Sequence, residues 1–231
     1  MKNVMTALAL LIGVAGLAAQ SADKTYPPAF PRTNATKLHE TDRFVVWDIV
    51  WPKGQPTAMH RHVYDQLGTY YARGGRLITM PDGTSRPSLT ETGSLSTTKK
   101  GTTHIEEGTT VPPLRAVFIE LKKEGPSGLP EVSRDLPPAF PRAGAKQLLD
   151  DERATIWEYT WKPGAPRFTY RAGRDTVIVY LGDGTVTFTP QNGAPGTLEA
   201  SPGRMRYLAR GSVETEEGAG GAPRAIVFEL K

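Results

Sequence analysis

The chain has 231 residues, enough for one large domain or two compact ones, and its content of 23% charged and 38% hydrophobic residues is typical of a globular protein. It contains no cysteine, which excludes disulfides, thiolate metal ligands and cysteine nucleophiles and leaves histidine for any soft-metal chemistry. The net charge is +4 and the basic residues are scattered, so nucleic-acid binding is not expected.

Residues 1–21 are predicted to be a secretory signal peptide. Lys2 precedes an uncharged apolar run over residues 7–19, and small residues follow it. The run is shorter than the roughly 20 residues that a membrane span needs, so no stable membrane insertion is expected after cleavage. The mature protein is therefore expected in the periplasm or outside the cell.

An internal repeat divides the rest of the chain. Residues 27–32, with the sequence Pro-Pro-Ala-Phe-Pro-Arg, recur letter for letter as residues 137–142, and this shift of 110 continues through both halves. Each unit is far longer than a solenoid repeat, so each is expected to be a domain with its own core. The predicted domains are an N-terminal unit over residues 22–122, a Pro- and Gly-rich linker over 123–134, and a C-terminal unit over 135–231.

Within each unit, short β-rich runs alternate with turn signals, and helical periodicity is weak. In the first unit we expect strands over residues 43–51, 66–72, 76–80 and 114–121, with a glycine-containing hairpin turn at 81–83. Many short strands at such spacing favour a sandwich or a closed barrel. The even spacing of Trp47 and Trp51 places both on one face of a strand, where core or inter-repeat packing is favoured over ligand stacking.

Three of the four histidines fall in two short segments, His60-Arg61-His62 and His104. Residues i and i+2 of a strand point to the same side, so the His-x-His spacing directs two imidazoles into one pocket. A third imidazole from a facing strand would complete a site for Fe, Mn, Ni, Cu or Zn. His39, in contrast, is interpreted as part of a surface turn, and Arg61 is expected to point away from the metal face.

The first histidine segment resembles the first motif of the cupin superfamily. That motif runs Gly, five residues, His-x-His, three or four residues, Glu, six residues, Gly. Here Gly54 is followed by five residues, then by His60 and His62, then by three residues and Gln66, while Arg73 stands where the closing glycine is expected.

The second histidine segment resembles the second cupin motif, which runs Gly, five residues, Pro-x-Gly, two residues, His, three residues, Asn. Gly93, Gly101 and His104 keep this spacing, with Lys99 in place of the proline and Gly108 in place of the asparagine. The resemblance implies an all-β chain of two tandem cupin-type jelly-roll barrels. It also implies that His60, His62 and His104 are ligands of a divalent metal, with Gln66 in the place of the usual glutamate.

The glutamine at position 66 leaves its role open. Gln66 is neutral and a weaker ligand than glutamate, so direct ligation through its carbonyl oxygen, binding through a water molecule and a purely shaping role are all compatible with the sequence. Asp65 is adjacent, but strand parity directs it to the other face unless the preceding turn is irregular. Tyr70 shares the parity of Gln66, and Tyr180 matches it in the second unit, which favours packing.

The second unit lacks the histidines. The positions that match His60, His62, Gln66 and His104 are occupied by the residues Tyr170, Ala172, Thr176 and Glu214. The C-terminal unit is therefore expected to keep the barrel without the metal and to serve as a packing partner rather than as a second binding pocket.

These features predict a site for a small-molecule ligand or substrate. Three neutral imidazoles leave the +2 charge of a metal uncompensated, so the site is expected to favour an anionic or enolisable ligand. The resemblance makes a dioxygenase that acts on a small enolisable or phenolic substrate the leading hypothesis, with iron as the favoured metal. A non-catalytic metal- or small-ligand-binding protein and a metal-dependent isomerase, lyase or hydrolase are the alternatives, and both a monomer and a homo-oligomer are compatible with the duplication.

Overall fold

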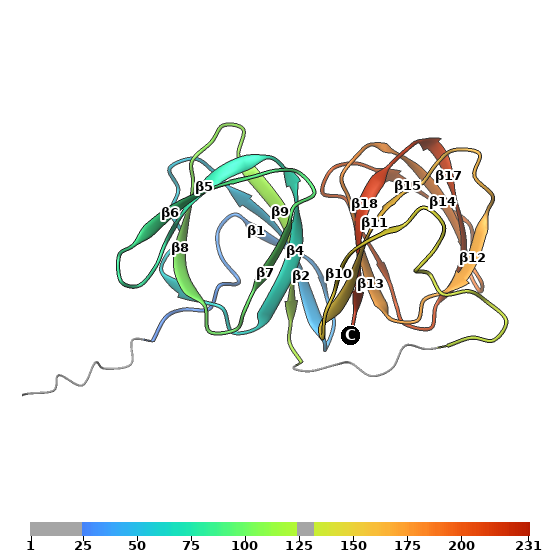
Figure 1. Ribbon diagram of the computed structural model, residues 1–231, viewed down its shortest axis with the longest axis horizontal. Helices are drawn as coiled ribbons and strands as arrows, with labels where there is room; N and C mark the ends of the chain where they lie inside the picture. Colours follow the sequence, from blue (N-terminus) through green and yellow to red (C-terminus); the bar gives the residue numbers. More distant parts are fainter. Residues whose placement is uncertain (1–24, 124–131) are drawn as a thin grey trace, which may run out of the picture.

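The computed structural model describes residues 25–123 and 132–231. Every regular element within them is a β-strand, and among them no helix is long and apolar enough to cross a membrane. Figure 1 shows these strands gathered into two barrels that lie side by side. The prediction of an all-β chain with two tandem barrels is confirmed, whereas the predicted signal peptide lies outside the described residues.

The first barrel is built from two antiparallel sheets. The five-stranded sheet has the order β1-β2-β9-β4-β7, and the four-stranded sheet has the order β3-β8-β5-β6. The strands are β1 (Ala35–Glu40), β2 (Phe44–Trp51), β3 (His60–Arg61), β4 (Asp65–Ala72), β5 (Gly74–Thr79), β6 (Ser85–Thr90), β7 (Leu95–Thr98), β8 (Thr103–Gly108) and β9 (Leu114–Leu121).

The second barrel repeats this arrangement. Its sheets have the orders β10-β11-β18-β13-β16 and β12-β17-β14-β15, so each strand takes the place of the strand nine positions earlier. The strands are β10 (Lys146–Asp150), β11 (Ala154–Thr160), β12 (Phe168–Arg171), β13 (Asp175–Tyr180), β14 (Gly184–Pro190), β15 (Gly196–Ala200), β16 (Met205–Leu208), β17 (Val213–Gly221) and β18 (Arg224–Leu230). The duplication seen in the sequence is therefore also a duplication of topology.

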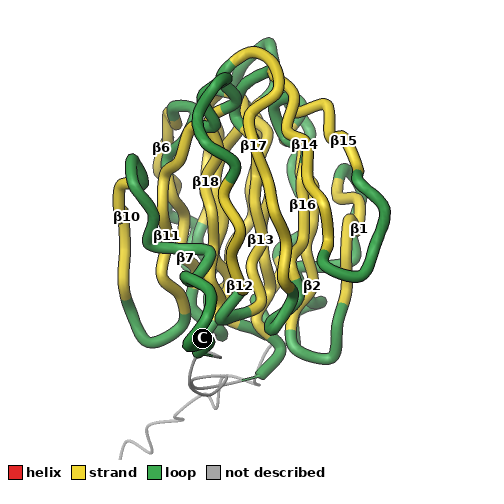
Figure 2. Tube along the Cα trace, turned by 90° about the vertical axis from the view of Figure 1, so that its right-hand side faces the viewer, coloured by secondary structure: helices red, strands yellow, loops and turns green. Residues whose placement is uncertain are grey.

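The turn chemistry of the sequence explains how the strands are joined. The predicted turn at residues 81–83 connects β5 to β6, where the amide of Met80 donates to the carbonyl of Thr84 at 2.8 Å. Gly83 adopts a φ of +86°, a conformation that favours glycine. Figure 2 shows the consequence, with strands running alongside one another and loops at their two ends.

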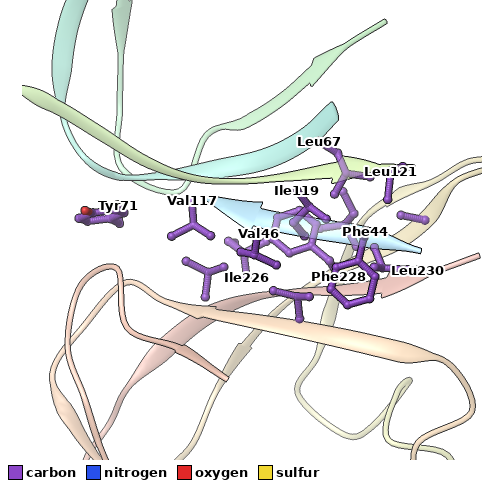
Figure 3. Close-up of a cluster of buried hydrophobic side chains, with 14 of the residues drawn as sticks. Phe44, Val46, Leu67, Tyr71, Val117, Ile119, Leu121, Ile226, Phe228 and Leu230 are labelled. Carbon is purple, nitrogen blue, oxygen red and sulfur yellow. The ribbon is translucent and has the colours of Figure 1, made fainter. Parts of the chain in front are cut away.

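An apolar layer joins the two barrels. Phe44 and Val46 of β2 point into this layer, whereas the intervening Val45 and the following Trp47 point into the first barrel, as the alternation of a strand requires. Figure 3 shows Phe44, Val46 and Ile119 meeting residues of the second barrel, among them Phe228. The central strands of the five-stranded sheets, such as β2 and β9, are thus buried on both faces.

Ion pairs across this interface are reciprocal. Arg43 donates to Asp175 at 2.5 Å, and Arg153 donates to Asp65 at 2.9 Å. Positions 153 and 175 are the repeat counterparts of 43 and 65, so each barrel gives the other the same pair of groups. This is the contact pattern of a two-fold symmetric dimer, here made within one chain.

His39 differs from its prediction as a surface-turn residue. It lies in β1, and its ring centroid is 4.4 Å from that of Tyr207 in the second barrel. The ring also approaches Phe44, with centroids 5.8 Å apart. His39 is therefore part of the interface, because β1 extends through the segment that the sequence suggested was a turn.

Candidate metal centre

The three clustered histidines come together in the first barrel. His60 of β3 and His104 of β8 are directly opposite each other in an antiparallel pair. His62 lies two residues beyond His60, and its backbone carbonyl accepts from the Gly101 amide at 2.7 Å, which holds it against the segment that precedes β8. One nitrogen from each ring falls within a group whose members all lie within 4.8 Å of one another. The convergence expected from the His-x-His spacing is present.

The separation of two of the three rings fits one divalent metal ion. Two imidazole nitrogens that each lie about 2.1 Å from one ion are about 3.0 Å apart at a right angle and about 3.4 Å apart at a tetrahedral angle. The Nε2 atoms of His62 and His104 are 3.3 Å apart. His60 Nδ1 lies 3.0 Å from the Ala58 carbonyl, so Nδ1 carries the proton and Nε2 keeps a free lone pair. That Nε2 is buried and has no hydrogen-bond partner, as expected of a nitrogen that is free to bind a metal.

Burial keeps these rings neutral. His60, His62 and His104 are 3%, 4% and 7% exposed. Burial lowers the pKa of His62 to about 3, and the neighbouring His104 and His60 act in the same direction. Burial lowers the pKa of His104 to about 4 against the opposing effect of Glu106, and it also lowers the pKa of His60. Neutral imidazole is the form that binds metal, so the ligands are ready at neutral pH.

A small cavity opens beside two of the histidines. Its volume is about 240 Å³, and its walls include His62, His104 and Gln66. Arg86 and Lys99 also line it, together with several serine and threonine hydroxyls. A cavity with these walls suits a small anion that accepts hydrogen bonds.

Gln66 and Asp65 take opposite directions. Gln66 is 4% exposed and reaches the cavity, as its parity predicted. Asp65 instead accepts from Arg153 across the interface and from the Lys100 backbone amide at 2.9 Å. Asp65 therefore has a packing role away from the histidines, and ligation by Gln66 stays a prediction.

A buried carboxylate, Glu106, lies next to the cluster. Its Oε1 is 3.9 Å from His104 Nε2 and accepts from Arg76, while its Oε2 accepts from Arg32 at 2.9 Å and from Trp51 Nε1 at 3.1 Å. Burial alone would raise the pKa of Glu106, but the Arg76 and Arg32 guanidiniums hold this pKa well below its usual range. Glu106 is a fixed anion rather than a proton acceptor.

The second barrel keeps that carboxylate and loses the histidines. Glu216, the counterpart of Glu106, accepts from Arg142 and from Trp161 Nε1 at 2.8 Å. Tyr170 stands in the place of His60 and donates to Glu216 at 3.0 Å. The buried carboxylate network is therefore a feature of the barrel itself, and the histidines are what distinguishes the first barrel.

Sequence reasoning missed Glu106, although two signals could have found it. Glu106 follows His104 by two residues and so shares its face of the strand. The set of Arg32, Trp51 and Glu106 also recurs in the second unit at the same shift of 110. The outward direction of Arg61 agrees with its prediction, since its Nε donates to Thr103 Oγ1 at 3.1 Å on the outer face. Tyr70 is 2% exposed and accepts from Arg76, in agreement with a packing role.

No protein-family model matches this sequence, and no curated protein matches it either. Solved structures do match. AerE from Microcystis aeruginosa aligns with a TM-score of 0.60 at 10% identity, over 85% of this chain and 97% of that one. A cupin 2 conserved barrel domain protein from Leptotrichia buccalis aligns with a TM-score of 0.55 at 11% identity, over 85% and 88%. Oxalate decarboxylase from Bacillus subtilis, a protein with Mn(II) centres, aligns with a TM-score of 0.53 at 13% identity, over 82% and 69%.

Proposed function

Because this chain has the cupin fold, carried as two tandem barrels, we propose that its first barrel is a metal-dependent catalytic site for a small anionic substrate. The observation that carries the proposal is the convergence of three buried, neutral imidazoles, two of which line a small cationic cavity. His60, His62 and His104 would hold the metal, with Gln66 beside them. The resident ion is a divalent metal among Fe, Mn, Zn, Ni and Cu, with iron favoured.

The reaction that we propose is dioxygenation of a small enolisable or phenolic acid. When bound, a redox-active ion such as iron supplies a Lewis-acidic centre and the means to activate O₂. The cavity of about 240 Å³ admits a ligand with about the volume of eight water molecules, which suits a compact acid. Arg86 and Lys99 on its walls attract and orient the anion.

The cavity offers no side-chain base in the described residues, which favours this reaction over an isomerase, lyase or hydrolase. Glu106 is held ionised by two arginines. Burial raises the pKa of Tyr70, which accepts a hydrogen bond from Arg76. A reaction that begins with proton abstraction by a side chain therefore lacks a general base in this cavity, whereas a substrate that binds as an anion does not need one.

A non-catalytic metal- or ligand-binding protein is the second candidate. It is favoured by the neutral Gln66 in the glutamate position, because a weaker ligand set suits reversible binding. The two candidates differ in turnover, which the experiment below measures. For either function, we propose that the segment at residues 1–21 directs export and that the protein acts without nucleic acid or a membrane. We propose a monomer or a homo-oligomer, since the two barrels of one chain already form a dimer-like unit.

The test is metal analysis of protein purified without a tag, for the wild type, His60→Ala and His39→Ala. His39 is a matched control because it is the one histidine of the sequence outside the cluster. We expect close to one equivalent of metal in the wild type and in His39→Ala, and a loss of metal in His60→Ala. Equal metal content in all three would contradict the site.

Turnover is measured on the same preparations. O₂ uptake with diketones, catechols or phenolic acids in the iron-loaded wild type, abolished in His60→Ala, supports the dioxygenase. Tightly bound zinc without O₂ uptake would exclude the dioxygenase and favour the metal- or ligand-binding protein.

A further inference from the structure

Two buried polar side chains lie opposite each other next to the histidine cluster. Gln66 of β4 and Glu120 of β9 are direct partners in an antiparallel pair, and each is 4% exposed. Side chains at such positions project to the same face, with Cβ atoms about 5 Å apart. Gln66 reaches the cavity that His62 and His104 line. Glu120 is therefore the cross-strand neighbour of Gln66, the cavity residue that stands in place of the expected glutamate.

Each member of the pair has one buried polar atom without a hydrogen-bond partner. These atoms are Gln66 Nε2 and Glu120 Oε1. The other oxygen of Glu120 accepts from Trp47 Nε1 at 2.9 Å, which anchors the carboxylate from the far side. An amide nitrogen only donates and a carboxylate oxygen only accepts, so the two unpaired atoms are complementary. The two side chains face each other across β4 and β9, so a Gln66 amide whose nitrogen turns to Glu120 has its carbonyl oxygen left for the cavity.

The Glu120 carboxyl, whose pKa burial raises, also constrains position 66. A glutamate at 66 would place two carboxylates directly opposite each other in a buried sheet, and like charges at such positions are destabilising. Glutamine keeps the shape of glutamate without the charge. The departure from the expected glutamate is thus explained by a residue 54 positions further along the chain, whose strand pairs with β4.

We propose that Glu120 is a positioning residue, which turns the Gln66 amide so that its carbonyl oxygen faces the metal held by the three histidines. Glu120 is also the reason that position 66 is neutral. This inference rests on the proposed metal site.

The second barrel provides a matched control. Thr176 and Glu229 occupy the equivalent paired positions, and Trp157 Nε1 donates to Glu229 at 2.8 Å. The same tryptophan–glutamate contact is therefore present where no histidine cluster exists. Glu229→Gln removes the same charge from the same kind of contact and leaves the histidines untouched.

The experiment titrates Co²⁺ into metal-free protein at pH 7, with calorimetry for the dissociation constant and visible absorption for the geometry at the ion. Glu120→Gln is expected to weaken Co²⁺ binding about tenfold and to change the absorption spectrum, since groups that orient ligands typically contribute 10- to 100-fold to metal affinity. Glu229→Gln is expected to leave both unchanged. A merely structural role for the tryptophan–glutamate contact would give the two variants the same result.

The charge rule is tested by Gln66→Glu in two backgrounds. In the wild type it is expected to lower the melting temperature of the metal-free protein by about 3 °C or more, and in Glu120→Gln by less than half as much. The gain in Co²⁺ affinity from Gln66→Glu is expected to be about tenfold larger in Glu120→Gln than in the wild type, because the lone carboxylate no longer shares a proton with Glu120.

Equal effects of Gln66→Glu in both backgrounds, or equal Co²⁺ affinity in Glu120→Gln and the wild type, would overturn the inference. If His60→Ala still lowers Co²⁺ affinity in that case, the metal site stands and only the role of Glu120 fails. If the wild type and His60→Ala bind Co²⁺ equally, the metal site and the inference fail together.

Discussion

Replacing Glu106 by glutamine tests the network beneath the histidines. The carboxylate side chain is 6% exposed and accepts from Arg32, Arg76 and Trp51. Glu106→Gln leaves two buried guanidiniums without their counter-charge, and removing one partner of a buried pair costs about 3–5 kcal/mol. For a chain of this size each kcal/mol shifts the melting temperature by about 2–4 °C. We therefore expect the melting temperature to fall by about 6–20 °C.

The assay is a calorimetric melt of metal-free protein at pH 7, with Glu107→Gln as the control. Glu107 is the next residue on β8 and its side chain points to the other face of the strand, so its substitution is expected to change stability by less than about 0.5 kcal/mol. Glu216→Gln in the second barrel is expected to cost about as much as Glu106→Gln. A Glu106→Gln melt within 2 °C of the wild type, or one that matches Glu107→Gln, would refute the reasoning.

The same carboxylate has a pH signature. The folded protein holds the pKa of Glu106 well below its usual range, chiefly through Arg76 and Arg32 acting against burial. The ionised form is therefore favoured more in the folded state than in the unfolded state. Its contribution to the free energy of unfolding is present at neutral pH and is lost as the pH falls below about 4.5, where the unfolded carboxyl takes up a proton.

Two further predictions concern the interface and the histidines. Gly203→Ala would place a Cβ atom 2.7 Å from the Tyr71 ring, whereas Gly101→Ala meets nothing within 4 Å, and the two φ values are +86° and +88°. The backbone strain of an alanine at positive φ is common to both variants. The additional loss of unfolding free energy in Gly203→Ala, about 1–3 kcal/mol in urea unfolding, therefore measures the clash of the new methyl group with Tyr71, and equal losses would argue against that contact. The pKa values of His62 and His104 are lowered to about 3 and 4 in the folded protein. As the pH falls from 6.5 toward 4, the unfolded state therefore binds protons that the folded state does not bind. Melts of metal-free protein should therefore show falling stability over that window, with a smaller fall in His62→Gln, and a flat profile would count against burial of neutral rings.

The fold and the histidine cluster could be predicted because both follow from local periodicities. The shift of 110 between identical segments identified two units, and strand alternation placed His60 and His62 on one side. Alternation could not tell which face of β2 meets the other barrel, because Val45 and Val46 are both apolar and both buried. Strands that are covered on both sides carry no polar face to mark their direction.

The rest of the site depends on contacts between distant positions. Arg76 reaches Glu106 in the first barrel, but its repeat counterpart is Val186, and the second barrel supplies Arg206 from another strand instead. A repeat therefore does not fix which strand delivers a buried charge. The opposition of Gln66 to Glu120 likewise depends on the register between β4 and β9, which no local pattern encodes.

The most direct test of the proposed centre is an anomalous-scattering map of crystals grown from tag-free protein. The account predicts one peak in the first barrel with nitrogen atoms of His60, His62 and His104 about 2.0–2.2 Å away, and no peak at Tyr170 and Glu214 of the second. A peak elsewhere, or a metal that contacts fewer than three of these rings, would contradict it.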